Sequence, residues 1–187
     1  MTKIAVLASH NGSGLDALYK ASKEKILDIE IVLVISNNTN AKALQNAKEY
    51  KIANFLLNDI TSDNPHARME ELLHAHGCEY IFLSGYMKKL SSNITTNFKV
   101  INSHPSLLPN YSGAGMYGRF VHEAIIKNKE AISGVTIHEV NENYDEGKII
   151  LQKSISLSKD ETVDSLQVKI KALEATAIID AFKLCLK

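Results

Sequence analysis

Short apolar runs alternate with longer amphipathic stretches along most of this chain, and this rhythm constrains the fold more than any other feature. The runs at residues 3–8 and 29–35 are almost unbroken, as is typical of parallel strands buried on both faces. The stretches at 15–25 and 41–50 repeat apolar residues at helical spacing. This order predicts an α/β fold in which helices flank a mostly parallel sheet.

The same order continues toward the C-terminus. Further strands are predicted at 54–57, 80–84, 100–103, 134–140 and 148–157, and further helices at 65–76 and 121–127. Apolar residues recur at helical steps over 163–184, and Ser158 followed by Glu161 fits a capping box that begins this last helix. Because no repeat or Pro/Gly/Ser-rich linker interrupts the 187 residues, we expect a single doubly wound, Rossmann-like domain spanning 1–187.

Charge and cysteine content narrow the class of partner. Lysine plus arginine and aspartate plus glutamate both number 21, so no basic excess indicates a nucleic acid or a membrane surface. Cys78 and Cys185 stand far apart and are expected to be free thiols in a reducing compartment. No apolar run has transmembrane length and no signal peptide precedes the first strand. We expect a cytoplasmic protein that acts on small molecules without a metal; the sequence predicts no particular oligomeric state.

A polar triplet, Asn102-Ser103-His104, closes one of the predicted buried strands. Alternate side chains of a strand share a face, so Asn102 and His104 should point the same way. Pro105 cannot continue a central ladder, which places both side chains where the strand leaves the sheet. Open α/β sheets bind ligands at that edge. The pair is therefore a candidate site, the alternative being that His104 only bonds a neighbouring carbonyl.

A glycine loop, Asn11-Gly12-Ser13-Gly14, lies between the first predicted strand and the first predicted helix. Glycines allow the backbone to approach a ligand, and a helix N-terminus offers unpaired N–H groups, so a phosphate is the ligand we expect. The loop matches neither a Walker motif nor a full dinucleotide fingerprint. An ordinary glycine turn remains the alternative.

An acidic loop at residues 141–147 separates the last two predicted strands, and Asp145 is its candidate for function. A carboxylate near His104 would favour the protonated imidazole and orient the ring, as a general acid requires. The alternative is an ordinary turn aspartate. His138, on the preceding strand, either faces the same pocket or packs beside it.

Four motifs, taken in order, resemble the folate-dependent formyltransferase family. They are Asn11-Gly12-Ser13 after the first strand, Gly85-Tyr86-Met87 after the fourth, Asn102-x-His104-Pro-Ser-Leu-Leu-Pro, and Asp145-x-Gly147. The likeness spans nearly the whole chain, and the third motif is specific to the superfamily, although its members use different acceptors. The resemblance implies one-carbon transfer from the co-substrate 10-formyltetrahydrofolate to the amine of 5-phosphoribosylglycinamide, a step of purine (IMP) biosynthesis.

The resemblance also implies roles for individual residues. The amide of Asn102 and a protonated His104 would hold the oxyanion of a tetrahedral intermediate, with Asp145 keeping the imidazole charged. The implied acceptor site comprises Asn11, Gly12, Ser13, Gly14 and Glu174. The implied folate site comprises Met87, Lys88, Lys89, Leu90, Asn102, Asn141, Glu142, Asn143, Tyr144 and Asp145. Lys88 stands where arginine is usual and Gly14 where asparagine is frequent, and the family's folate-contacting arginine is left unassigned over residues 61–68.

Other functions are compatible with the same motifs. A formyltransferase acting on methionyl-tRNA or an amino sugar, or a formyltetrahydrofolate hydrolase, would share the central signature. We expect these alternatives to fit the sequence less well, because such enzymes extend beyond this core. An amino-sugar acceptor would also place no ribose phosphate at the glycine loop. A non-catalytic folate- or nucleotide-binding module is the alternative of a different class.

Overall fold

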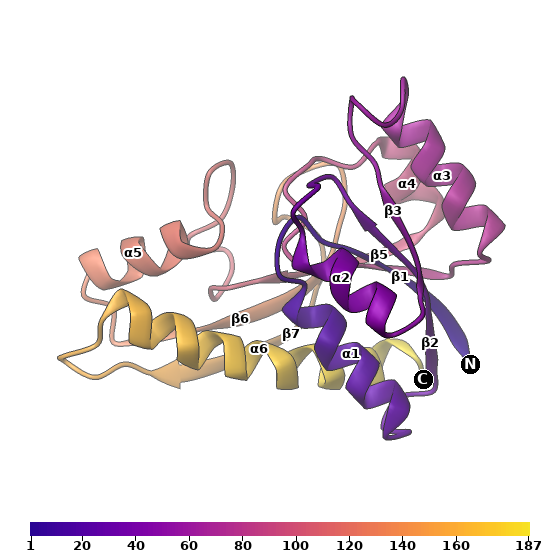
Figure 1. Ribbon diagram of the computed structural model, residues 1–187. Helices are drawn as coiled ribbons and strands as arrows, with labels where there is room; N and C mark the ends of the chain where they lie inside the picture. The colour runs from indigo at the N-terminus through magenta and orange to yellow at the C-terminus, as the bar shows by residue number, and fades with distance from the viewer. The chain divides into compact units, whose positions relative to one another are not determined.

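The computed structural model describes residues 1–187, which divide into two units, Met1–Ile101 and Asn102–Lys187 (Figure 1). The first unit contains β1 (Thr2–Leu7), α1 (Ser13–Lys23), β2 (Ile29–Ser36), α2 (Lys42–Glu49), β3 (Ala53–Leu56), α3 (Pro65–Ala75), β4 (Tyr80–Leu83) and α4 (Ser92–Asn97). Strand β5 (Lys99–His104) begins in the first unit and ends in the second. The second unit continues with α5 (Arg119–Lys127), β6 (Ile132–Glu139), β7 (Ile149–Ser156) and α6 (Val163–Cys185).

The strands form one sheet in the order β3-β2-β1-β4-β5-β6-β7. Strand β1 pairs in parallel with β2 and β4, β2 pairs in parallel with β3, and the β6–β7 hairpin is antiparallel. The predicted α/β class with a mostly parallel sheet is therefore confirmed. Strand order reverses at β1, which has β2 on one side and β4 on the other, so the segment after β1 lies at a topological switch point.

The core of the first unit surrounds β1. Its residues Ile4 to Leu7 are completely buried, as expected for a central parallel strand. Helices α1 and α2 lie together on one face of these strands, while α3 lies on the other (Figure 1). This arrangement follows because the right-handed crossovers through α1 and α2 step from β1 outward to β3, whereas the crossover through α3 steps back to β4, on the other side of β1. The doubly wound prediction thus holds within this unit.

The second unit is built on the β6–β7 hairpin. Strand β7 alternates between more and less exposed residues as predicted, and α6 packs along both strands. Gly134 of β6 is required by close packing, because a Cβ there would overlap the Lys153 carbonyl and the Leu107 side chain. None of the helices combines the length and apolar character that a membrane span requires.

One local prediction was wrong, and one helix was not predicted. The cap of α6 is Thr162, whose hydroxyl accepts from the Ser165 N–H at 3.1 Å, whereas Ser158 and Glu161 form the preceding turn. Glu161 is held instead by Lys169, with 2.6 Å between its Oε2 and the Nζ. Helix α4 was not predicted, because its sequence is polar and only Ile94 is buried, so no apolar period marks it.

Candidate active site

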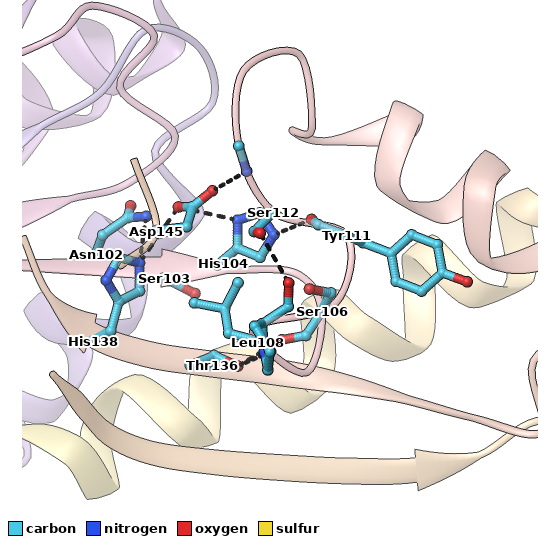
Figure 2. A network of polar contacts seen from close by, with 12 residues as sticks. Asn102, Ser103, His104, Ser106, Leu108, Tyr111, Ser112, Thr136, His138 and Asp145 are labelled. Atoms are coloured by element: carbon cyan, nitrogen blue, oxygen red, sulfur yellow. Dashed lines mark hydrogen bonds and ion pairs between the residues drawn. The ribbon is translucent and has the colours of Figure 1, made fainter. Parts of the chain in front are cut away.

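Strand β5 ends with Asn102 half-buried and His104 buried. Figure 2 shows both side chains directed toward Asp145, as strand alternation predicts. Ser103, between them, instead donates a hydrogen bond from its hydroxyl to Glu174 at 2.6 Å. The strand end therefore presents an amide and an imidazole together on one face.

His104 has an acceptor beside each ring nitrogen. Its Nε2 lies 2.7 Å from the backbone carbonyl oxygen of Tyr111, and its Nδ1 lies 3.6 Å from Oδ1 of Asp145. A carbonyl oxygen can only accept, so Nε2 carries a proton. Only a ring protonated on both nitrogens can also direct an N–H toward the carboxylate. His104 thus does bond a neighbouring carbonyl, but it faces an acid as well.

Asp145 is held in place by backbone conformation and by the loop that follows β5. Its φ of 57° lies in the left-handed region, which is unusual for a residue other than glycine. Its Oδ2 accepts from the Gly113 N–H at 3.0 Å, and its side chain is only 10% exposed. Both His104 and Asp145 therefore hydrogen-bond the same loop, one through the Tyr111 carbonyl and the other through the Gly113 amide.

His138, whose role the sequence left open, belongs to this cluster. Its Nε2 lies 3.1 Å from Nδ2 of Asn102 and 3.6 Å from Oδ1 of Asp145, and its Nδ1 lies 2.8 Å from the Glu139 carbonyl oxygen. Burial lowers the pKa of His138, although the Glu139 carbonyl and the Asp145 charge act in the opposite direction. No motif marked this residue; the signal would have been its register on β6, which the sequence does not supply.

Thr136 positions the segment after His104, and sequence reasoning missed this residue. Its hydroxyl accepts from the Leu108 N–H at 3.0 Å and donates to the Ser106 carbonyl at 2.7 Å (Figure 2). Gln152 donates to the Leu108 carbonyl and to the Thr136 hydroxyl, both at 2.9 Å. This network ties the turn after the signature histidine to β6 and β7.

Glu174, an expected acceptor contact, is not part of the cluster around His104. It lies on α6, is partly buried, and accepts from Ser103, whose side chain leaves β5 on the face opposite to His104. Burial raises the pKa of its carboxyl, while the Ser103 hydroxyl and Lys171 partly offset this effect. A polar contact with a ligand would relieve part of that burial cost.

The glycine loop of the first unit leads into α1. Asn11 is exposed and Gly12, with φ 67°, precedes the helix, which has no side-chain cap at this end. The Gly14 N–H donates to the Ser84 hydroxyl at 3.0 Å, and a Cβ on Gly14 would overlap the Phe82 ring. The loop therefore needs glycine for packing and still presents a helix N-terminus without a capping side chain.

The residues expected to bind folate lie on two loops. Met87, Lys88 and Lys89 are exposed and Leu90 is buried, and the Met87 N–H donates to the Ser9 hydroxyl at 2.8 Å. In the second unit, the expected residues before Asp145 are exposed: Asn141, Glu142, Asn143 and Tyr144. The only arginine of residues 61–68, Arg68, pairs with Glu71 on α3 at 2.7 Å. No group of three or more His, Cys, Asp or Glu side chains is placed to hold a metal ion.

Comparison with known proteins bears on this arrangement directly. The sequence profile described as formyl transferase matches residues 2–182. The chain belongs to the formyl transferase family. It is 32% identical to the phosphoribosylglycinamide formyltransferase of Bacillus subtilis over 93% of this chain and 89% of that protein. The fold agrees with the crystal structure of the Bacillus halodurans phosphoribosylglycinamide formyltransferase, with a TM-score of 0.90, 27% identity, and coverage of 100% and 96%.

A longer relative contains the same region as one part. The bovine trifunctional purine biosynthetic protein adenosine-3 is 32% identical over 97% of this chain, which corresponds to 18% of that protein. The resemblance drawn from the sequence is thus confirmed both for the family and for the type of enzyme, a phosphoribosylglycinamide-type formyltransferase.

Proposed function

We propose that this chain transfers the formyl group of 10-formyltetrahydrofolate to the amine of 5-phosphoribosylglycinamide in purine biosynthesis. The observation that carries the proposal is the gathering of Asn102, His104 and Asp145 at the end of β5. It occurs in a chain that matches a phosphoribosylglycinamide formyltransferase over 89% of that protein's length.

The chemistry assigns one task to each group. The acceptor amine attacks the formyl carbon, and the carbonyl oxygen of the formyl group becomes an oxyanion. An N–H of Asn102 and the positive charge of the buried His104 ring stabilise this oxyanion, and such electrostatic stabilisation is strong where water is excluded. The attacking nitrogen then loses a proton and the leaving folate nitrogen gains one. The charged ring of His104 gives a proton to the folate nitrogen as the bond from that nitrogen to the formyl carbon breaks, and it regains one from the attacking nitrogen. Asp145 stabilises the charged form of the ring.

The 3.6 Å separation between His104 Nδ1 and Asp145 Oδ1 is too long for a hydrogen bond. Catalytic hydrogen bonds are often long in a protein without substrate and shorten when the substrate binds. We therefore take 3.6 Å as the separation in the substrate-free enzyme. We expect the distance from His104 Nδ1 to Asp145 Oδ1 to shorten when both substrates are bound.

The binding assignments follow from the loops. The acceptor phosphate binds the N-terminus of α1 at Asn11, Gly12, Ser13 and Gly14, and Glu174 contacts the acceptor. Folate binds along Met87, Lys88, Lys89 and Leu90 and along the 141–145 segment. We propose a single formyltransferase domain spanning 1–187, which acts in the cytoplasm and without a metal. The family match across residues 2–182 supports these binding assignments.

An acceptor panel tests the proposal. Purified protein is given 10-formyltetrahydrofolate together with 5-phosphoribosylglycinamide, a 4-amino sugar nucleotide, methionyl-tRNA, or water alone, and release of tetrahydrofolate is followed. The proposal expects turnover with the phosphoribosyl amine alone. Turnover with another acceptor would overturn the substrate assignment. Binding of folate and acceptor in a thermal-shift titration without any transfer would indicate a non-catalytic module.

A further inference from the structure

His138 lies in the cluster but has no task in the chemistry described above. Its side chain projects from β6 and is 1% exposed, so it cannot exchange protons readily with solvent. Its two ring nitrogens each have a polar neighbour, the Glu139 carbonyl at Nδ1 and the Asn102 amide at Nε2. Asp145 Oδ1 also faces Nε2, but at 3.6 Å it is too distant for a hydrogen bond, so the two closer neighbours determine what the ring can do.

The tautomer of His138 follows from the Glu139 carbonyl. A carbonyl oxygen accepts only, so the 2.8 Å contact requires a proton on Nδ1. In the neutral ring Nε2 is then an acceptor. The Nδ2 of Asn102, 3.1 Å away, is a donor and fits that acceptor. Burial, which lowers the pKa of His138, favours the neutral ring that this pairing needs.

The orientation of the Asn102 amide then matters for catalysis. With Nδ2 bonded to Nε2 of His138, the second N–H of the same NH₂ group remains available to a ligand. A flipped amide would place Oδ1 against the lone pair of Nε2. We propose that His138 is a positioning residue that holds the Asn102 amide in the orientation that donates to the developing oxyanion, an inference that rests on the proposed function.

Two variants of matched shape test this role. Gln at position 138 can place a carbonyl oxygen near the position of Nε2, whereas Met has a similar length and no strong acceptor. For His138→Met we expect kcat to fall about ten- to a hundredfold, since misplacing a catalytic group costs up to that much. The KM values for both substrates should change less than about threefold. His138→Gln should keep kcat within about fivefold of the native value.

A double-mutant cycle separates positioning from an independent catalytic task. In an Asn102→Ala background, His138→Met should cause little further loss, because its effect passes through the missing amide. An additional tenfold loss in that background would overturn the proposal. His122→Met is the matched control, since His122 is also buried, its Nδ1 has no hydrogen-bond partner, and it lies on α5 outside the cluster. Its kcat should match that of native protein.

Nitrogen-15 NMR of the native protein provides a readout that does not depend on activity or on variant folding. The His138 resonances should report a neutral ring protonated at Nδ1 at neutral pH. A proton on Nε2 would contradict the inference, because that nitrogen could no longer accept from Asn102. Failure of the acceptor panel would overturn the proposed function instead, and it would leave this spectroscopic result unchanged.

Discussion

Replacing Thr136 by valine should loosen the turn that follows the signature histidine. Thr136 is completely buried, and its hydroxyl is the acceptor for the Leu108 N–H and the donor to the Ser106 carbonyl. Valine has nearly the same shape, so the substitution leaves no large cavity. It removes the hydrogen bonds to both backbone groups, which stay buried, and also the one from Gln152, whose Nε2 still donates to the Leu108 carbonyl.

The expected magnitude follows from those two orphaned groups. A buried donor or acceptor that loses its partner costs about 1–3 kcal/mol. Two such groups, partly relieved by local relaxation, should lower the free energy of unfolding by about 2–4 kcal/mol. For a chain of this size that corresponds to a fall in Tm of roughly 5–15 °C. The same turn precedes Tyr111, whose carbonyl accepts a hydrogen bond from the His104 ring. Loosening the turn should therefore misplace His104 and lower kcat by about tenfold.

Urea unfolding and steady-state formyl transfer, measured on the same preparations, test this prediction. The control is Thr176→Val, an exposed threonine on α6 whose hydroxyl bonds the Leu173 carbonyl and Lys153. It should change the free energy of unfolding by no more than about 0.5 kcal/mol. A Thr136→Val protein as stable as this control would refute the reasoning that the hydroxyl holds the turn.

Three further substitutions are informative. Gly14→Ala places a Cβ against the Phe82 ring and should lower the free energy of unfolding by about 1–3 kcal/mol in a urea titration, with a raised KM for the phosphorylated acceptor. Ser9→Ala removes the acceptor of the Met87 N–H, so steady-state kinetics should give a several-fold higher KM for folate and an unchanged KM for the acceptor. Burial raises the pKa of Glu174 above its ordinary 4.5, so the folded protein favours the protonated carboxyl. The free energy of unfolding should therefore fall as the pH rises from about 4.5 through the raised pKa. The Glu174→Gln variant should lack this decline and be at least as stable as native protein at pH 7 in urea titrations at several pH values.

Much of the fold could be predicted because its strands are apolar and buried. The run that becomes β1 is almost free of polar residues, and the glycine loop after it marks the beginning of α1. The cap of α6 could not be placed, because Ser158 and Thr162 both satisfy the rules for a helix start and only tertiary contacts choose between them. Helix α4 is polar and has no apolar residues at helical spacing, so the sequence pattern could not predict it.

Some residues of the site could likewise be predicted from local sequence, whereas others depend on tertiary packing. Asn102 and His104 were predictable from one strand, since alternation and Pro105 are local properties. Thr136 and His138 were not, because their roles depend on the register of β6 beside the turn that follows β5, and register is set by tertiary packing. Asp145 was named as a candidate, but its approach to His104 depends on a loop conformation with positive φ.

The central claim is that the cluster at the end of β5 performs the transfer. The most direct test is the single-turnover rate of formyl transfer to 5-phosphoribosylglycinamide by native protein and by Asn102→Ala, His104→Ala and Asp145→Asn, each shown to be folded and to bind folate. Each variant should lose about two to three orders of magnitude in rate while substrate binding changes little. Rates within about fivefold of native in any one of the three would contradict the role assigned to that residue, and near-native rates in all three would place the chemistry elsewhere.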